Sequence, residues 1–273
     1  MQIRFEVGDA APLRNFAVQV GRLAEAALAF VGDVFSLGLE AVGFIARGGL
    51  RPRLLVQQMA VIGADSLLLC ALILFFSGMV LGLNTAKELV SFGAGSYVGG
   101  MVVVTIVREL GPTLSGILVA ARAGSAMAAE TGSMVVTEQV DALRALAVSP
   151  VRYLVAPRLA ASLIMLPLLT LIAEVFGTVG AYVVSLQAGV SPNQFLHSAD
   201  VFLTGRDLFG GLGKTVVFGA IIALVGCRQG LRAAPGAVGV GRATTSAVVT
   251  SIVLILIADY FLSAAILLPV TPR

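Results

Sequence analysis

Long apolar runs dominate the chain and predict five membrane-spanning helices. A helix needs about 20 mostly apolar residues to cross the roughly 30 Å of hydrocarbon in a bilayer. Five segments meet that requirement with few charges: residues 66–83, a stretch within 89–121, and residues of about 159–184, 208–227 and 246–268. These segments assign residues 51–273 to one transmembrane domain.

Residues 13–50 have a different pattern, in which polar side chains recur at steps of three or four residues or sums of these steps. Such spacing places them on one stripe of a helix, with apolar residues between them. The stripe is too polar for a spanning helix, so we expect an amphipathic helix in the membrane interface, after a short tail at residues 1–12. The alternative, a helix packed on a soluble domain, finds no such domain to cover. The polar stripe comprises Asn15, Gln19, Arg22, Glu25, Asp33, Ser36 and Glu40.

Composition supports an all-α integral membrane protein. Hydrophobic residues make up 58% and charged residues 12%, with a mean hydropathy of +0.99, whereas soluble domains carry about 25% charged residues. This balance excludes a soluble enzyme, a nucleic-acid-binding protein and a disordered protein. His197 is the only histidine, and Cys70 and Cys227 lie in apolar runs. We therefore expect no metal site, no catalytic triad and no disulfide framework.

The Lys and Arg residues between the apolar segments predict the orientation in the membrane. Thirteen of them lie before the first segment and in the loops after the second and fourth segments, against four on the other side, with Arg108 left out as intramembrane. Because basic residues concentrate in cytoplasmic loops, we expect a cytoplasmic N-terminus. An odd number of spans then places the C-terminus outside.

Arg108 and Glu109 are adjacent charges well inside an apolar stretch. Adjacent residues on a helix diverge by about 100°, so we expect them to find separate partners rather than each other. Two interpretations stay open: structural ion pairs with another helix, or the lining of a substrate cavity or a dimer seam. Gly111 and Pro112 follow and are expected to kink or break the helix.

Other polar residues also fall within or at the edge of the predicted spans: Arg122, Glu130, Glu174, Lys214 and Asp259. Glu174 and Asp259 could relay protons, which would indicate an ion-coupled secondary transporter. We favour structural hydrogen bonding with neighbouring helices for both. The motif GGLGKT at residues 210–215 resembles the end of a phosphate-binding loop, but Leu208 stands where that loop needs its first glycine. Any ATP must therefore be bound by another chain.

The loop after the second span predicts a short cytoplasmic helix over residues 138–148. Thr137 is expected to cap it, Glu138 and Asp141 favour its first turn, Asp141 can pair with Arg144, and Ser149-Pro150 ends it. A charged face and an apolar face together suit a partner's groove, although an ordinary surface helix is the alternative. The expected contact residues are Thr137, Glu138, Gln139, Asp141, Ala142 and Leu143.

Several motifs stand in order along this part of the chain. They are RELGP (108–112), AARAGSA (120–126), AETGSM (129–134), TEQVDAL (137–143), YLVAPR (153–158), GVGRATT (239–245) and DYFL (259–262). As an ordered set they resemble the MlaE/YrbE family, the permease subunits of lipid-transporting ABC systems that work with MCE proteins. The resemblance covers about residues 13–268.

The resemblance implies a homodimeric permease in the bacterial inner (cytoplasmic) membrane. It implies cytoplasmic ATPase subunits, carrying ATP and Mg, docked on the loop around residues 138–143, and no cofactor on this chain. It further implies an MCE hexamer on the outer side, in many systems a small STAS-domain subunit, and a phospholipid, sterol or fatty acid held between the two copies.

Two other functions compete with a lipid permease. One is an ion-coupled carrier that uses Glu174 and Asp259, and the other is a non-transporting scaffold that anchors an ATPase. In each case this chain is expected not to be an enzyme.

Overall fold

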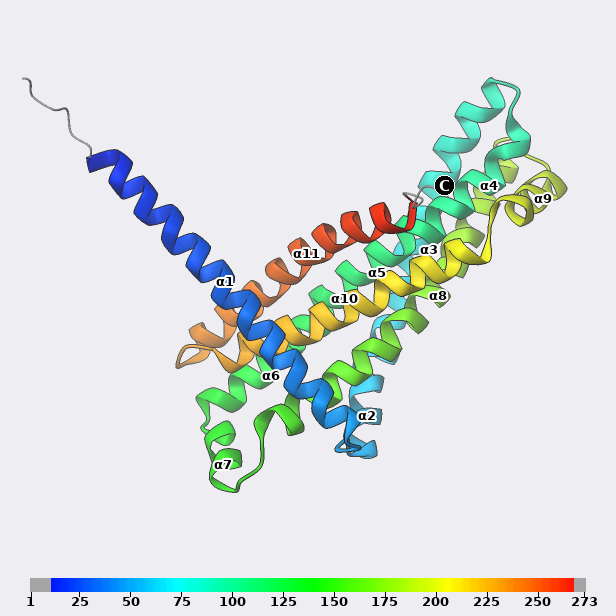
Figure 1. Cartoon of the computed structure of the whole chain (residues 1–273). Coiled ribbons are helices and arrows are strands. Elements are labelled where there is room, and N and C mark those ends of the chain that lie inside the picture. The colour runs from blue at the N-terminus through cyan, green and yellow to red at the C-terminus, as the bar shows by residue number, and fades with distance from the viewer. Residues whose placement is uncertain (1–10, 268–273) are drawn as a thin grey trace, which may run out of the picture.

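The computed structural model describes residues 11–267, and this part of the chain is helical with no strand. Figure 1 shows an elongated bundle from which the N-terminal half of α1 extends. The α-helices are α1 (Ala11–Ala46), α2 (Pro52–Met59), α3 (Asp65–Ser91), α4 (Val98–Thr105), α5 (Gly111–Val119), α6 (Ser125–Val136), α7 (Gln139–Ala145), α8 (Ala156–Gln187), α9 (Pro192–Phe202), α10 (Gly205–Leu231) and α11 (Ala237–Leu267).

Short helices of other types join several of these elements. One is a 3₁₀ turn, η2 (Gly95–Tyr97), and four are π-helical segments: η1 (Ala60–Ala64), η3 (Ile106–Leu110), η4 (Ala120–Gly124) and η5 (Val151–Val155). Because these segments connect without loops, Gly95–Val136 forms one helical stretch of 42 residues. The predicted break at Gly111 and Pro112 is therefore a π-helical turn within a continuous helix.

All five predicted spans fall in long helices of the bundle. Among residues 11–267, six helices are long and apolar enough to cross a membrane by length and composition. The additional one is Leu28–Ala46, the second half of α1, of which only 6% is buried. This window is apolar because most of the polar stripe precedes it. Whether α1 lies in the interface or crosses the membrane stays a prediction.

The helix expected over residues 13–50 is confirmed as α1, which ends before a turn with Gly48 at φ +68°. Ala11 already belongs to this helix, so it begins two residues earlier than expected. The tail placed at residues 1–12 lies almost entirely outside the described residues, as does the end of the chain after residue 267. Asp33 of the polar stripe faces α10, where it pairs with Arg228 and Arg232.

Small residues bring the long helices into close contact. A side chain at Gly78 of α3 would overlap the backbone of Gly177 on α8, and one at Gly226 of α10 would lie 3.0 Å from the carbonyl oxygen of Gly124. Close backbone approach of this kind is the usual means of helix packing in lipid. The glycines thus hold α3 against α8 and α10 against the π-helical turn η4.

Large apolar side chains lie on the outside of the bundle as well as in its core. Leu74, Leu166 and Phe218 are fully or almost fully buried, whereas Leu68 is 70% exposed and Phe261 is 65% exposed. A water-soluble monomer rarely exposes a large contiguous apolar surface. The outer surface of the helices is therefore suited to contact with lipid.

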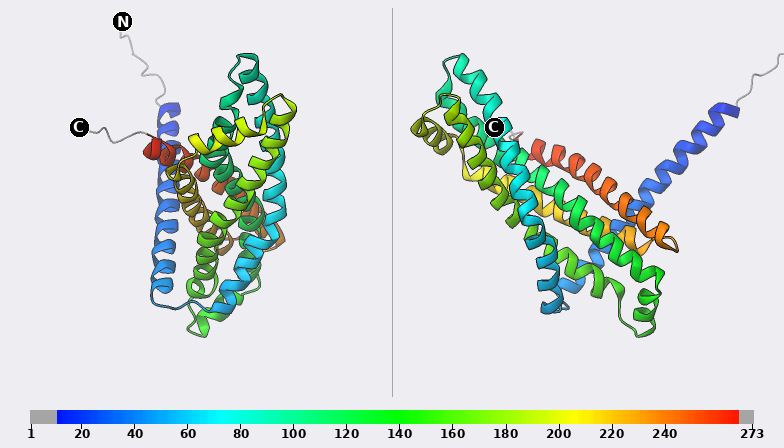
Figure 2. Two further views of the ribbon diagram at one scale, coloured as in Figure 1. Left: turned by 90° about the vertical axis from the view of Figure 1, so that its right-hand side faces the viewer. Right: turned by 180° about the vertical axis from the view of Figure 1, so that it is seen from behind.

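The two ends of the bundle carry different connections. The short helix α7 lies at one end, while α9 and the turn between α3 and α4 lie at the opposite end (Figures 1 and 2). This arrangement agrees with the predicted placement of the two loops on opposite sides of a membrane.

Candidate functional site

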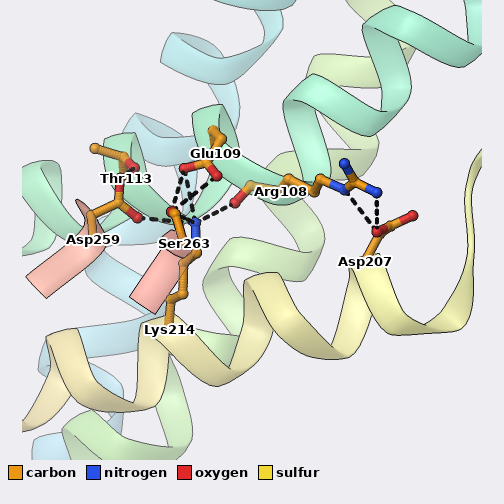
Figure 3. A network of polar contacts seen from close by, with 7 residues as sticks. All are labelled: Arg108, Glu109, Thr113, Asp207, Lys214, Asp259 and Ser263. Carbon is orange, nitrogen blue, oxygen red and sulfur yellow. Dashed lines mark hydrogen bonds and ion pairs between the residues drawn. The ribbon is translucent and has the colours of Figure 1, made fainter. Parts of the chain in front are cut away.

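A network of polar side chains surrounds Lys214 on α10 (Figure 3). Its ammonium group donates hydrogen bonds to Glu109 Oε2 at 2.8 Å, to Ser263 Oγ at 2.6 Å and to the carbonyl oxygen of Arg108 at 2.9 Å. Asp259 Oδ1 lies 3.1 Å away and completes the contacts. Only 3% of the Lys214 side chain is exposed. The buried ammonium is thus fully paired, as a charge in a low-dielectric interior requires.

Pro112 explains why a backbone oxygen takes part. In an α-helix the carbonyl of residue 108 would accept a hydrogen bond from the N–H of residue 112, but proline has no N–H. The π-helical turn η3 ends at Leu110, and the carbonyl oxygen of Arg108 accepts a hydrogen bond from Lys214. The sequence of η3 and α5 therefore creates an acceptor for the lysine.

Arg108 turns away from this cluster toward the start of α10. Its guanidinium contacts Asp207 Oδ1 at 2.7 Å, and Asp207 Oδ2 in turn accepts hydrogen bonds from the backbone N–H and the hydroxyl of Thr204. The expectation that Arg108 and Glu109 find separate partners is confirmed. Together the two pairs join η3 to the first and third turns of α10.

Three members of the network were missed from the sequence: Asp207, Thr113 and Ser263. Thr113 donates to Asp259 Oδ2 at 3.2 Å, and Ser263 donates to Glu109 Oε1 at 3.1 Å. One signal was available for Asp207, which stands seven residues before Lys214 and so lies on the same face of α10, two turns away. Lone hydroxyl residues such as Thr113 and Ser263 give no comparable signal.

The network is open on one side. The side chains of Arg108 and Glu109 are 38% and 40% exposed, respectively. The hollow among Arg108, Glu109, Asp207 and Lys214 has a volume of only about 10 Å³, room for at most one water molecule. Within one chain this site therefore holds no organic ligand, and its exposed charges require a cover of water or protein if they lie in a membrane.

Glu174 differs from the other acids. Its side chain on α8 is buried against Gly111, and no group in the described part of the chain hydrogen-bonds either carboxyl oxygen. The expectation of structural hydrogen bonding is confirmed for Asp259 and is wrong for Glu174. Gly111 gives the carboxyl group space, but its backbone N–H already donates to the carbonyl oxygen of Ile106.

The remaining predicted intramembrane charges form pairs nearer the α7 end. Arg122 on η4 donates to Ser66 Oγ at 3.2 Å and lies 3.5 Å from Asp65. Glu130 on α6 pairs at 2.7 Å with Arg158, whose side chain is only 6% exposed. These contacts join η4 to the start of α3, and α6 to α8.

The predicted cytoplasmic helix is present as α7, but it is shorter than residues 138–148. Thr137 does not cap it: its hydroxyl donates to the carbonyl oxygen of Ser133 at the end of α6. Glu138 stands at the N-cap in a left-handed conformation with φ 59° and makes no side-chain cap. The tight turn that leads out of α6 imposes this conformation. The expected pair of Asp141 and Arg144 is confirmed at 2.8 Å.

One side of α7 is anchored and the rest is free for contact. Val140 is buried, whereas Thr137, Glu138, Gln139, Asp141 and Ala142 are exposed and Leu143 is half-buried. Leu146, just after the helix, is 74% exposed. The apolar anchor thus holds α7 against the bundle and presents its acidic first turn to the outside.

Comparison with known proteins identifies the family. A family model described as Permease MlaE matches residues 55–265. The chain is 41% identical over 252 residues to a "Probable ABC transporter permease protein" of Rickettsia felis, covering 92% of this chain and 97% of the relative. The chain belongs to the MlaE permease family.

Two further relatives extend the comparison. A probable ABC transporter permease protein of Synechocystis is 42% identical over 80% of this chain and 84% of the relative. The Arabidopsis thaliana protein TRIGALACTOSYLDIACYLGLYCEROL 1, chloroplastic, is 40% identical over 81% of this chain and 63% of the relative. The match to an ABC transporter permease family agrees with the multi-pass helical structure.

The structure of this MlaE-family permease places the motif at residues 210–215 in a helix. The segment lies inside α10, where it forms helix rather than a loop, and its Lys214 is engaged with Glu109, Asp259 and Ser263. A phosphate-binding loop needs free backbone N–H groups and a free lysine. The segment therefore lacks the loop geometry of a phosphate-binding site, and the absence of a nucleotide on this chain stays a prediction.

Proposed function

We propose that this MlaE-family permease moves phospholipid or a related lipid between membranes, driven by ATP hydrolysis on a separate subunit. The observation that carries the substrate class is the 40% identity to the Arabidopsis protein, whose name is that of a galactolipid. The ABC transporter permease relatives support the ATP-driven part of the proposal.

The ATPase is proposed to dock on α7. The exposed residues Thr137, Glu138, Gln139, Asp141 and Ala142, with the half-buried Leu143, form a small surface at one end of the bundle. Because Val140 and the turn after α6 tie this surface to the bundle, a push on α7 would reach α6 directly. The chain itself is proposed to hold no cofactor or metal, with ATP and Mg on the ATPase.

The lipid is proposed to lie between two copies of the chain, beside Arg108 and Glu109. These side chains are 38% and 40% exposed, and uncovered charges at membrane depth are costly. A second copy or a water-filled cavity would cover them. Next to Leu110 the chain also has a hollow of about 470 Å³, lined mainly by apolar residues of α3 that include Phe76 and Val80. A homodimer would enclose this hollow and the charged pair together.

The remaining partners and the location are proposed from the resemblance to the same family. We propose a bacterial inner membrane, with the N-terminus and α7 on the cytoplasmic side and the C-terminus outside. An MCE hexamer would receive or deliver lipid on the outer side, a STAS-domain subunit would bind the ATPase, and nucleic acid would play no part.

Reconstitution tests the proposed function. The chain and its ATPase are placed in donor vesicles with a fluorescent phospholipid, and its arrival in acceptor vesicles is measured. We expect transfer that requires hydrolysable ATP and is unchanged by a protonophore. Transfer by the chain alone, driven by a proton gradient, would overturn the proposal.

That last outcome belongs to a second candidate function, an ion-coupled carrier. The specific observation in its favour is Glu174, a carboxyl group that is 3% exposed and has no hydrogen-bond partner in the described part of the chain. Replacing Glu174 by Gln would abolish proton-driven transfer in such a carrier. In an ATP-driven permease the same change should leave the ATP requirement as it is.

A further inference from the structure

A groove lined only by apolar side chains lies between α1 and the rest of the bundle. Its volume is about 560 Å³, within the range of about 300–1,000 Å³ that is usual for sites that hold a small organic molecule. Its walls include Phe30 and Leu39 of α1, Leu163 of α8 and Leu224 of α10. In this region α1 and α10 touch closely at Gly38 and Leu224.

A polar pocket of about 210 Å³ opens beside the crossing of α1 and α10. Arg228 and Arg232 both contact the same oxygen of Asp33, at 2.7 and 2.6 Å. One carboxylate thus faces two guanidinium groups, and the other acid that lines the pocket, Glu40, accepts a hydrogen bond from the Ser149 hydroxyl. Arg232 is 59% exposed, so its guanidinium can bind a further anionic group.

The pocket and the groove meet at Arg228. The guanidinium of Arg228 lies 4.3 Å from the ring centroid of Phe30, and Phe30 is itself a wall of the groove. An apolar channel that begins at a pair of arginines matches an amphiphile with an anionic head and a long hydrocarbon chain. Basic pockets between membrane helices bind phospholipid head groups in this way.

We propose that this site holds one resident phospholipid, with its phosphate on Arg232 and Arg228 and an acyl chain in the groove under α1. The lipid would fill the space between α1 and α8 and so fix the angle at which α1 leaves the bundle. This site lies apart from the charge network around Lys214 and holds the lipid whether or not the permease transports lipid.

Photolabelling tests the proposal on the full chain in vesicles. The probe is phosphatidylglycerol with a diazirine on its acyl chain, and labelled peptides are mapped after irradiation. We expect labelling concentrated on residues 28–46 and on the part of α10 around Leu224. Leu39→Trp should block the groove and Arg232→Glu should remove the phosphate contact, which lowers labelling at least about fivefold.

Matched variants control for general effects. Leu168→Trp alters an exposed leucine of α8 outside the groove, and Arg242→Glu reverses an exposed charge on α11 outside the pocket. Both should label like the unchanged chain. Equal labelling of α1 and the outer face of α8 would overturn the proposal. So would an efficient disulfide between two copies with Phe35→Cys, because that result assigns the groove to a second copy of the chain.

Discussion

At the residue scale, Pro112 lacks a backbone hydrogen-bond donor, and Lys214 supplies a donor from another helix. Proline removes the N–H that would have bonded the carbonyl of Arg108, and the lysine ammonium supplies the missing donor. The same ammonium pairs with Glu109 and Asp259, so three segments far apart in the sequence meet at one buried charge. The network contains five charged side chains, Lys214 included; two are positive and three are negative, which leaves one negative charge in excess.

Removing this charge should destabilise the fold strongly. Lys214→Met leaves Glu109 and Asp259 without their cation, and breaking a buried pair costs about 3–5 kcal/mol. We expect a loss of that size in the free energy of unfolding of the purified protein in detergent. Lys87→Met, at an exposed lysine of α3, is the matched control and should change it by less than about 0.5 kcal/mol. Equal effects of the two variants would show that the network is not a structural centre.

Sequence reasoning located some of these residues and could not locate others. Arg108, Glu109 and Lys214 stand out because charges are rare in apolar segments. Glu174 stood out for the same reason. Its lack of a hydrogen-bond partner depends on its packing against Gly111 of another helix, which a local sequence pattern does not predict. Partner choice is a property of packing, and the sequence alone does not specify it.

At the scale of elements, short π-helical turns carry several of the charged side chains that lie inside the bundle. Arg108 and Glu109 lie on η3, and Arg122 lies on η4. Such turns rotate the side chains that follow relative to a regular α-helix and are frequent at functional sites. The sequence indicated a kink at Gly111 and Pro112, but the form of the irregularity required the structure.

The helix α7 offers an element-scale prediction. Glu138→Arg combined with Asp141→Arg reverses the charge of its exposed acidic surface. Truncating one partner of a buried charge contact costs about 2–5 kcal/mol, and reversal should cost at least as much. We therefore expect the ATPase to be lost when the complex is purified, while membrane insertion is unchanged.

The control for α7 uses two acids at the opposite end of the bundle. Glu88 and Asp200 are exposed near the end of α3 and on α9. Their combined change to Arg should leave the ATPase bound. If the Glu138 and Asp141 variant kept its ATPase with transport unchanged, α7 would not be the coupling element.

At the scale of the whole molecule, the apolar segments predicted the long helices and their order because burial in lipid demands continuous apolar runs. They did not distinguish five spans from six, because the second half of α1 is apolar enough to span and still carries Asp33 and Glu40. The length of this half of α1 fits either a spanning or an interfacial placement. Its contacts with the bilayer decide between the two.

The two ends of the bundle give a topology prediction. Ser149 follows α7 and Ser198 lies on α9, at opposite ends of the molecule (Figure 1). Single cysteines at these positions, in a chain whose buried Cys70 and Cys227 are left unchanged, should react with impermeant reagents from opposite sides of the membrane. Because Ser198 itself is buried, the exposed neighbour Asp200→Cys serves as the second probe of that end. Labelling of both ends from one side would rule out this topology.

The most direct test of the central claim is the number of lipid molecules transferred per ATP hydrolysed by the reconstituted complex, compared between the unchanged chain and Glu109→Ala. The account predicts that the unchanged complex couples the two and that the variant stays inserted, keeps its ATPase and hydrolyses ATP but transfers several-fold less lipid. A variant that transfers lipid normally would contradict the placement of the lipid path beside Arg108 and Glu109, and an unchanged complex that transfers lipid equally well without ATP would contradict an ATP-driven permease.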